Sequence, residues 1–496
     1  MPEFRCVDVP LVPRPLERLH AAIGDEGWRR LRATQGFARR EFGDRAVWSI
    51  SSTTRGGGVA EMLRSLLAYA RGAGIDARWS VVTGPPEFFT LTKRLHNRLH
   101  GDPGDGGPIG RDEHRLYEQV LAANADDLAG RLRPGDVVIL HDPQTAGMAG
   151  RLRHAGATVV WRCHVGTDRA GDEVREPWAF LVPYVEEADA VVFSRRGFVP
   201  EMLSREPVAI IAPSIDPASA KNQELEPTVI RAILDRTGLV RDHAPGGVAP
   251  AFRRDDGSPG RVDRFCEVVR TGPSPSTDEP LVVHVSRWDR LKDPVGTLRG
   301  FAEHAVDSTG AHLILAGPTV RSVADDPEAV AAFDEAVAAW RDLPHERRRH
   351  VQLACLPMAD VEENGAIVDA LQRQATVVTQ KSRREGFGLT ITEAMWKARP
   401  VVASGVGGIL DQVEDGRSGV LLDDPEDLAH FGAEVAGLLA DAPRGEALGA
   451  GARARVREHF LHDRHLEQYA ALLAALSNGG EVPASPEAPA GAGAQP

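Results

Sequence analysis

The fold is decided by the stretch Glu385-Gly386-Phe387-Gly388-Leu389-Thr390-Ile391-Thr392-Glu393. The apolar run before it, at residues 375–379, predicts a buried strand, and residues 390–398 predict a helix. The glycines between them let the backbone approach a ligand at the helix start, where free N–H groups and the helix dipole favour a phosphate. Glu385 and Glu393 can both face a ligand lying across that start. Because ordinary helix caps look similar, this interpretation depends on charged partners elsewhere.

The composition is that of a water-soluble enzyme with more than one domain. A chain of 496 residues is too long for one core, so we expect two domains. The net charge of -13 argues against a nucleic-acid partner. Four widely spaced cysteines predict neither a zinc site nor a disulfide framework. Since no leader peptide or membrane-spanning run is evident, we expect a cytoplasmic protein without a membrane partner.

Strands and helices alternate along the chain, which predicts an α/β protein with doubly wound parallel sheets. The strands are expected at 46–50, 77–82, 137–140, 158–161, 190–193 and 208–211, and again at 281–285, 313–316, 351–354, 375–379, 401–403 and 419–422. We predict an N-terminal domain at 1–280, a C-terminal domain at 281–460, a closing helix at 461–477 and a disordered tail at 478–496. Residues 241–280 are rich in Pro and Gly, and we interpret them as an insertion or linker with a short strand at 265–269.

Polar residues follow several strands of the N-terminal half. Gly56-Gly57-Gly58 comes after the first strand and predicts either a second phosphate cradle or only a tight turn. Two further clusters stand at strand ends, and they contain His141, Asp142 and Gln144 in one case and Arg162 and His164 in the other. Ligands bind at the carboxyl ends of such strands, so two clusters there indicate a site, although one histidine alone would indicate a structural role.

Two cations follow the first strand of the C-terminal half. Arg287 and Lys292 lie in one loop, and two fixed cations there can stabilise the negative charge of a phosphate group. The alternative is a surface ion pair with Asp289 or Asp293.

Several motifs together resemble one family. The spacing from Glu385 to Glu393 resembles the nucleotide-sugar site of retaining GT-B glycosyltransferases, the group of glycogen and sucrose synthases. The motifs at 56–61, 92–97, 141–144, 161–164, 213–217 and 285–294 are similar to those of the glycosyltransferring trehalose synthases. The resemblance covers roughly residues 45–460. One departure is that Val165-Gly166-Thr167 follows His164 where an acidic residue is expected, a role that Asp168 can take.

The resemblance implies a GT-B fold, with two Rossmann-like domains facing across a cleft and a final helix that crosses back to the first domain. It implies a retaining glucosyltransferase that makes trehalose reversibly from a nucleoside-diphosphate glucose and free glucose. The implied catalytic residues are Arg287, Lys292, Glu385 and His164, with His164 at the 6-hydroxyl of the transferred sugar. The implied donor contacts are Gly57, Gly58, Arg287, Lys292, Gly386, Phe387, Gly388, Leu389 and, at the ribose, Glu393. The implied acceptor contacts are His141, Asp142, Gln144 and Arg162.

Several alternatives stay open on the sequence. A retaining trehalose phosphorylase has the same fold but needs no ribose contact from Glu393. Another sugar-nucleotide transferase, or an inactive sugar sensor, also fits parts of the pattern. We expect no obligatory metal or other cofactor, because no Asp-x-Asp motif for a metal–diphosphate stands out, while Mg²⁺ accompanying the nucleotide is allowed. The donor base, the direction of the reaction and the formation of a homodimer are open.

Overall fold

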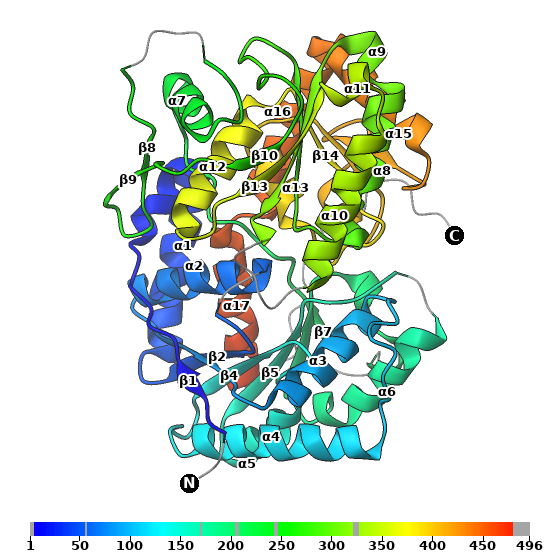
Figure 1. The fold of residues 1–496 in the computed structure, drawn as a ribbon. Helices are drawn as coiled ribbons and strands as arrows, with labels where there is room; N and C mark the ends of the chain where they lie inside the picture. The colour runs from blue at the N-terminus through cyan, green and yellow to red at the C-terminus, as the bar shows by residue number, and fades with distance from the viewer. Residues whose placement is uncertain are drawn as a thin grey trace. The chain divides into compact units, whose positions relative to one another are not determined.

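The computed structural model describes residues 4–54, 57–168, 171–203, 208–242, 247–320 and 327–479. The chain forms two compact units, each with its own large sheet (Figure 1). Unit 1 contains the chain up to Asp216 together with the segment that begins at Phe460. Unit 2 contains Pro217–His459. The predicted α/β class is confirmed.

Unit 1 has a seven-stranded sheet with the order β1-β3-β2-β4-β5-β6-β7. The strands are β1 (Val7–Asp8), β2 (Ala46–Ser51), β3 (Asp76–Val81), β4 (Val137–His141), β5 (Thr158–Cys163), β6 (Ala190–Phe193) and β7 (Val208–Ile210). Only the short edge strand β1 is antiparallel to its neighbour, β3. The central strands β4, β5 and β6 are buried on both faces because helices cover both sides of the sheet.

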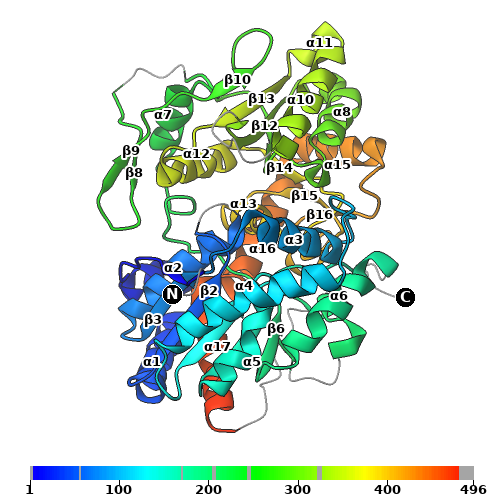
Figure 2. The same cartoon turned by 60° about the horizontal axis from the view of Figure 1, so that its bottom comes forward.

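Helices cover the two faces of this sheet in two groups (Figure 2). One group is α3 (Pro86–Leu99), α4 (Arg111–Ala129), α5 (Ala149–His154) and α6 (Asp172–Val185). The other group is α1 (His20–Phe42), α2 (Gly58–Gly72) and α17 (His462–Ser477). Short 3-10 turns are η1 (Leu16–Leu19), η2 (Ala146–Met148), η3 (Arg196–Phe198) and η4 (Glu201–Leu203).

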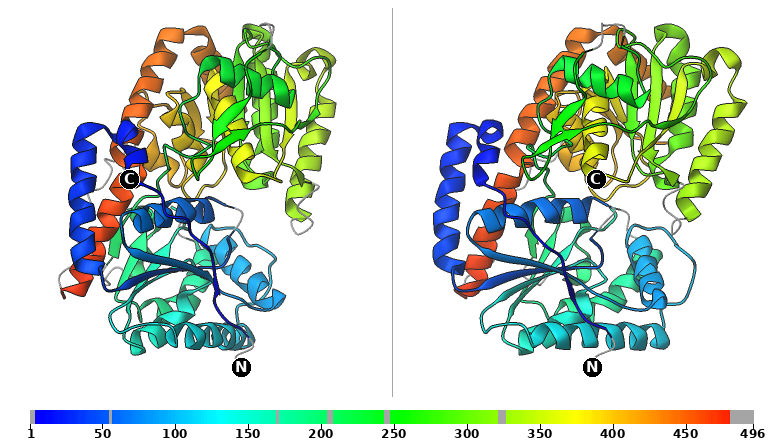
Figure 3. Two further views of the ribbon diagram at one scale, coloured as in Figure 1. Left: turned by 90° about the vertical axis from the view of Figure 1, so that its left-hand side faces the viewer. Right: turned by 60° about the vertical axis from the view of Figure 1, so that its left-hand side comes forward.

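The last helix, α17, is an integral part of unit 1. It runs beside α1 in both views of Figure 3. Its buried residues Leu472 and Leu473 belong to one apolar cluster with Ile139 of β4 and Val160 of β5. The apolar stripe of this helix therefore completes the core on one face of the sheet.

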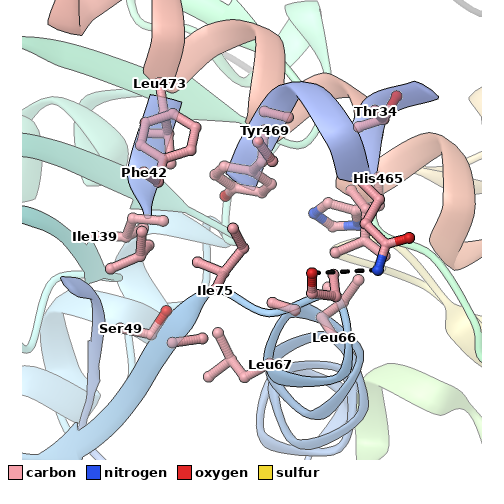
Figure 4. Close-up of a pocket in the computed structure, with 18 of the residues that line it drawn as sticks. Thr34, Phe42, Ser49, Leu66, Leu67, Ile75, Ile139, His465, Tyr469 and Leu473 are labelled. Atoms are coloured by element: carbon pink, nitrogen blue, oxygen red, sulfur yellow. Dashed lines mark hydrogen bonds between the residues drawn. The ribbon is translucent and has the colours of Figure 1, made fainter. Parts of the chain in front are cut away.

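A cavity of about 120 Å³ lies between this helical group and the sheet (Figure 4). Apolar side chains line most of its wall, including Phe42 of α1, Leu66 of α2 and Leu473 of α17. Ile139 lines it on the side of the sheet. Atoms that border such a space lose dispersion contacts that a larger side chain could restore.

Ala470→Leu is expected to stabilise unit 1, because Ala470 of α17 is buried and lines the cavity. Filling a cavity typically adds about 1 kcal/mol to the free energy of unfolding, which would raise the melting temperature by about 2–4 °C. Differential scanning calorimetry measures the change. Ala471→Leu is the matched control, because Ala471 is exposed on the same helix. A lower melting temperature for Ala470→Leu alone would contradict the prediction.

Unit 2 has a second seven-stranded sheet with the order β10-β13-β12-β11-β14-β15-β16. The strands are β10 (Glu267–Val269), β11 (Leu281–Val285), β12 (His312–Pro318), β13 (Val351–Leu356), β14 (Val377–Gln380), β15 (Val401–Ser404) and β16 (Val420–Leu422). Apart from β10, which is an antiparallel edge strand, the neighbours are parallel. From β11 onward the order is that of a Rossmann fold.

Helices flank this sheet on both sides (Figure 1). One side has α8 (Pro294–His304), α10 (Pro327–Asp342) and α15 (Leu428–Ala440), and the opposite side has α7 (Pro227–Thr237) and α12 (Val361–Gln374). The others are η5 (Arg290–Lys292), α9 (Val306–Thr309), α11 (His345–Arg348), α13 (Leu389–Trp396), α14 (Ile409–Gln412) and α16 (Ala442–His459).

The domain boundary predicted at residue 280 lies instead after Asp216, because residues 217–280 belong to unit 2. The strand expected at 265–269 is β10, and it extends the unit 2 sheet by pairing with β13. A hairpin of β8 (Ala251–Arg253) and β9 (Pro259–Arg261) was not predicted, because both strands are short and β9 contains Pro and Gly. Arg254 of this hairpin forms ion pairs with Asp360 at 2.7 Å and Glu362 at 2.8 Å. Of the predicted tail, residues 480–496 lie outside the described residues.

Candidate active site

The polar loops of unit 2 lie where its strand order reverses. β14 pairs with one side of β11, and β12 pairs with the other side. Ligands bind in open α/β sheets beyond the carboxyl ends of strands at such a point. The loop after β11 carries Arg287 and Lys292, and the loop after β14 carries Glu385.

Lys292 and Glu385 form a direct ion pair. The Nζ of Lys292 lies 2.6 Å from both carboxylate oxygens of Glu385. The two side chains are only 16% and 8% exposed, so little water screens the pair. The hydroxyl of Ser382 also donates to Oε2 of Glu385, at 3.2 Å. The structure thus places a cation and a carboxylate side by side at the predicted donor position.

Two further contacts join the same loops. The backbone N–H of Arg383 donates to the carbonyl oxygen of Leu291 at 2.8 Å. Lys381 forms an ion pair with Asp293, and both side chains are buried. Asp293 has φ = 50° and also caps α8 by accepting a hydrogen bond from Gly296 N–H at 3.1 Å. The position of Lys292 is therefore set by a rigid, doubly anchored turn.

Arg287 is the more exposed of the two predicted cations. Its side chain is 61% exposed, and its Nη2 lies 3.0 Å from Oδ2 of Asp289. The surface ion pair that the sequence left open is thus present. Such an exposed pair contributes only about 0–1 kcal/mol, so Arg287 can exchange Asp289 for a more highly charged anion at little cost.

The loop before α13 needs glycine. Gly388 has φ = 86° and precedes the first residue of the helix, Leu389. A side chain there would be strained, and its Cβ would lie 3.1 Å from Cγ of Glu385. The N–H of Gly408 donates to the carbonyl oxygen of Gly386 at 2.9 Å, which fixes the loop from behind. The backbone N–H groups in the first turn of α13 are held in one orientation as a result.

Phe387, between these glycines, is a structural residue of the loop. Its side chain is buried, and its carbonyl oxygen accepts a hydrogen bond from Nε2 of Gln412. Gln412 in turn accepts a hydrogen bond at 2.5 Å from Thr392 of α13. Gln412 therefore links the backbone of Phe387 to α13 and α14.

Glu393 lies one turn inside α13 and is buried. Nζ of Lys221 lies 3.1 Å from its Oε1. Lys221 was not among the predicted site residues. The sequence offers one indication of a role for Lys221, its place a few residues after the motif at 213–217. No spacing rule relates Lys221 to Glu393.

The polar residues of unit 1 gather at the carboxyl ends of β4 and β5, and β4 borders the point where the strand order reverses. His141 and Arg162 are register partners on the paired strands β4 and β5. Nδ1 of His141 lies 3.2 Å from Nε2 of His164, and the two rings stack with centroids 5.5 Å apart. Burial lowers the pKa of His141 to about 3 and that of His164 well below its ordinary value. Both imidazoles are therefore neutral at pH 7.

Asp142 connects the two strand ends. It has φ = 64°, which is uncommon for a residue with a side chain and is typical of functional turns. Its Oδ1 accepts a hydrogen bond from the backbone N–H of His164 at 2.7 Å, and its carbonyl oxygen accepts one from Trp161 at 3.1 Å. Burial raises the pKa of Asp142 to about 7. This carboxyl group therefore titrates near neutral pH.

Arg162 is a fully buried cation. Its Nη1 donates to the carbonyl oxygen of Phe193 at 3.3 Å. Its Nε and Nη2 have no hydrogen-bond partner among the residues that the structure describes. Burial lowers the pKa of Arg162, and the negative charge of Asp142 opposes this shift. Such an incompletely satisfied group is uncommon in a structural core.

The other predicted residues of unit 1 have simpler surroundings. Gln144 is half-buried in the loop after β4, and its Oε1 has no hydrogen-bond partner within the described ranges. Gly57 has φ = 86° at the start of α2, and Gly58 is the first residue of that helix. Gly56 lies outside the described residues. Asp168 is exposed and forms an ion pair with Arg195.

The structure thus forms two groups of the predicted residues. In unit 2, Lys292 contacts Glu385, and in unit 1, Asp142 and His141 contact His164. Within the described ranges, no group of three or more His, Cys, Asp or Glu side chains is arranged to hold a metal ion. In the same part of the chain, no helix has the length and apolar character needed to cross a membrane.

Comparison with known proteins identifies the family. Residues 49–200 match the family model "Trehalose synthase, N-terminal domain", and residues 280–441 match "Glycosyl transferases group 1". A curated trehalose synthase from Thermococcus litoralis is 32% identical over 92% of this chain and 96% of its own length.

More distant relatives share the fold. A trehalose phosphorylase from Pleurotus pulmonarius is 27% identical over 80% of this chain but only 52% of its own length. The crystal structure of a UDP-forming α,α-trehalose-phosphate synthase from Burkholderia vietnamiensis superposes with a TM-score of 0.62 and 16% identity, covering 87% of this chain and all of that one. The fold is therefore GT-B, and the chain belongs to the trehalose synthase family of glycosyltransferases.

Proposed function

We propose that this enzyme transfers glucose, with retention of configuration, from a nucleoside-diphosphate glucose to free glucose and so makes trehalose. The observation that supports this most strongly is the arrangement in unit 2. A buried carboxylate on α13, a cation–carboxylate pair and the N-terminus of α13 lie together at the switch point of a Rossmann sheet. These are the groups that a ribose, a sugar and a diphosphate require.

Lys292 and Arg287 are proposed to bind the diphosphate. As the bond between the anomeric carbon and the phosphate oxygen breaks, negative charge grows on that oxygen. Preorganised cations and the N–H groups at the start of α13 stabilise this charge more than they stabilise the ground state. The exposed contact of Arg287 with Asp289 gives this residue the freedom to turn toward the anion.

Glu385 is proposed to accept hydrogen bonds from hydroxyl groups of the transferred glucose. Its carboxylate has about four lone-pair positions, so contact with Lys292 leaves capacity for sugar hydroxyls. The same ion pair places the sugar next to the cation that faces its leaving group. A single pair thus determines both the position of the sugar and the stabilisation of the phosphate.

The histidines of unit 1 are proposed to contact sugar hydroxyls as neutral imidazoles. A neutral imidazole has one donor and one acceptor nitrogen, which suits a hydroxyl group. His164 would take the 6-hydroxyl of the transferred glucose, and its contact with His141 would orient the His164 ring. His141, Asp142, Gln144 and Arg162 would bind the acceptor glucose.

In the proposed step, a hydroxyl oxygen of the acceptor bonds to the anomeric carbon on the face from which the phosphate leaves. The proton of that hydroxyl passes to the departing phosphate oxygen, so no separate protein base is needed. This scheme preserves the configuration at the anomeric carbon. Glucose and the nucleoside-diphosphate glucose become trehalose and the nucleoside diphosphate.

A product assay tests the function. The purified enzyme is incubated with glucose and, separately, with ADP-, GDP- and UDP-glucose, and the products are separated by chromatography. We expect trehalose and an equimolar nucleoside diphosphate from at least one donor. In the reverse direction, trehalose is supplied with either phosphate or a nucleoside diphosphate. Formation of glucose 1-phosphate alone would contradict the proposal and indicate a phosphorylase.

A further inference from the structure

The segment at residues 221–224 is firmly attached to the two helices that frame the donor position of unit 2. The indole N–H of Trp396 donates to the carbonyl oxygen of Asn222 at 3.1 Å. Arg373 of α12 donates to the carbonyl oxygen of Gln223 at 2.8 Å and forms an ion pair with Glu224 at 3.0 Å. Since both helices contribute, the segment has a fixed position against α12 and α13.

This attachment brings Lys221 to Glu393. Nζ of Lys221 lies 3.1 Å from Oε1 of Glu393, and the two side chains are 17% and 3% exposed. A buried carboxylate is costly unless a cation or several hydrogen-bond donors compensate it. Lys221 supplies a positive charge at the carboxylate itself and restricts the orientations that this carboxylate can adopt.

The other buried lysine nearby has different contacts. Nζ of Lys397 donates to Oδ1 of Asn222 at 3.0 Å and to the backbone carbonyl oxygen of Glu393 at 3.1 Å, and lies 3.5 Å from Asp369. It thereby fixes the segment and the helix backbone. Lys221, by contrast, contacts the carboxylate group that would face a ligand.

We propose that Lys221 is a positioning residue for nucleotide binding, because it holds the carboxylate of Glu393 in the orientation that accepts the ribose hydroxyls. This inference rests on the proposed function, in which Glu393 binds the ribose. Lys221 and two hydroxyl groups can share one carboxylate, which accepts about four hydrogen bonds. Lys221 thus acts through Glu393 and makes the site selective for a ribose over a deoxyribose.

The test measures selectivity for the ribose. ADP, GDP and UDP are titrated into the wild-type enzyme by calorimetry, and the tightest binder is compared with its 2′-deoxy and 3′-deoxy analogues. We expect the ribonucleotide to bind about tenfold more tightly than at least one analogue, as one lost hydrogen bond to a charged group implies. In Lys221→Met, affinity for the ribonucleotide should fall about tenfold, and affinity for that analogue should fall less than about threefold.

Two further variants distinguish positioning from a general loss of structure. Lys221→Arg keeps the charge and is expected to restore part of the selectivity. Arg417→Met removes an 82% exposed cation from the same unit and should leave the selectivity for the ribonucleotide unchanged. Two results would overturn the inference about Lys221 but not the proposed function. In the first, Lys221→Met loses affinity equally for the ribonucleotide and the analogue. In the second, that variant keeps the full selectivity of the wild type. A wild-type enzyme that does not distinguish the nucleotides would overturn the ribose role of Glu393 as well, and one that binds none would overturn the proposed function.

Discussion

Lys292→Ala is expected to lower turnover by about two orders of magnitude or more, a loss of roughly 3 kcal/mol in transition-state stabilisation. The substitution removes a cation 2.6 Å from Glu385 at the proposed diphosphate position. It also leaves the nearly buried carboxylate of Glu385 without that cation, which disturbs the sugar contact. Arg287→Ala is expected to have an effect of similar size. Initial rates at saturating donor and acceptor measure the loss.

Arg290→Ala is the matched control for these variants. Arg290 lies in the same short turn as Lys292, but its side chain is 61% exposed and pairs with Glu335. A surface pair of this kind contributes about 0–1 kcal/mol, so activity should stay close to that of the wild type. If Lys292→Ala and Arg287→Ala kept comparable activity with unchanged melting temperatures, the donor assignment in unit 2 would be wrong.

The second large effect is expected from removal of the last helix. A chain that ends before Arg464 loses most of α17, including the buried residues Leu472 and Leu473. Each buried leucine contributes about 1.5–3 kcal/mol, and several such losses consume most of the 5–15 kcal/mol that stabilises a typical domain. The sheet face around Ile139 and Val160 would also be exposed. We therefore expect insoluble or inactive protein.

A chain that ends after Gly479 is the control, because it keeps α17 complete. It should have the melting temperature and turnover of the full chain. Solubility after expression, near-ultraviolet circular dichroism and activity distinguish the outcomes. A soluble and active enzyme that lacks residues 464–496 would show that the core of unit 1 does not need α17.

The regular elements of the fold were predictable because their sequences are unambiguous. β11 and β14 are buried, valine-rich segments followed by polar loops, and α13 follows a loop with two glycines. The hairpin of β8 and β9 was not predictable, since its pattern of one buried residue per strand is too short to give a period. The boundary at residue 216 was missed for a related reason. The residues after it form α7 and β10, and β10 lies within the stretch 241–280, whose Pro- and Gly-rich sequence is typical of a linker.

The candidate site was only partly predictable. Arg287, Lys292, Glu385 and Glu393 were identified from motifs, and their roles stay predictions, as do the absence of an obligatory metal and the assignment of His141 and His164. The contacts that these side chains make with one another could not be derived from the sequence. The pairing of Lys292 with Glu385 depends on two strands being neighbours, and that of Lys221 with Glu393 depends on a segment without regular structure. Tertiary packing, and not local pattern, determines such contacts.

The place of α17 in unit 1 has a consequence for biosynthesis. Among the residues that the structure describes, unit 2 is one continuous segment, so it can fold as soon as it leaves the ribosome. Unit 1 is synthesised first, but one face of its sheet has no complete cover until residues 462–477 emerge. At about 5–20 residues per second, the intervening chain takes tens of seconds to make. During that interval the nascent first unit exposes an apolar surface that a chaperone can bind, so the part of the enzyme that is made first is completed last.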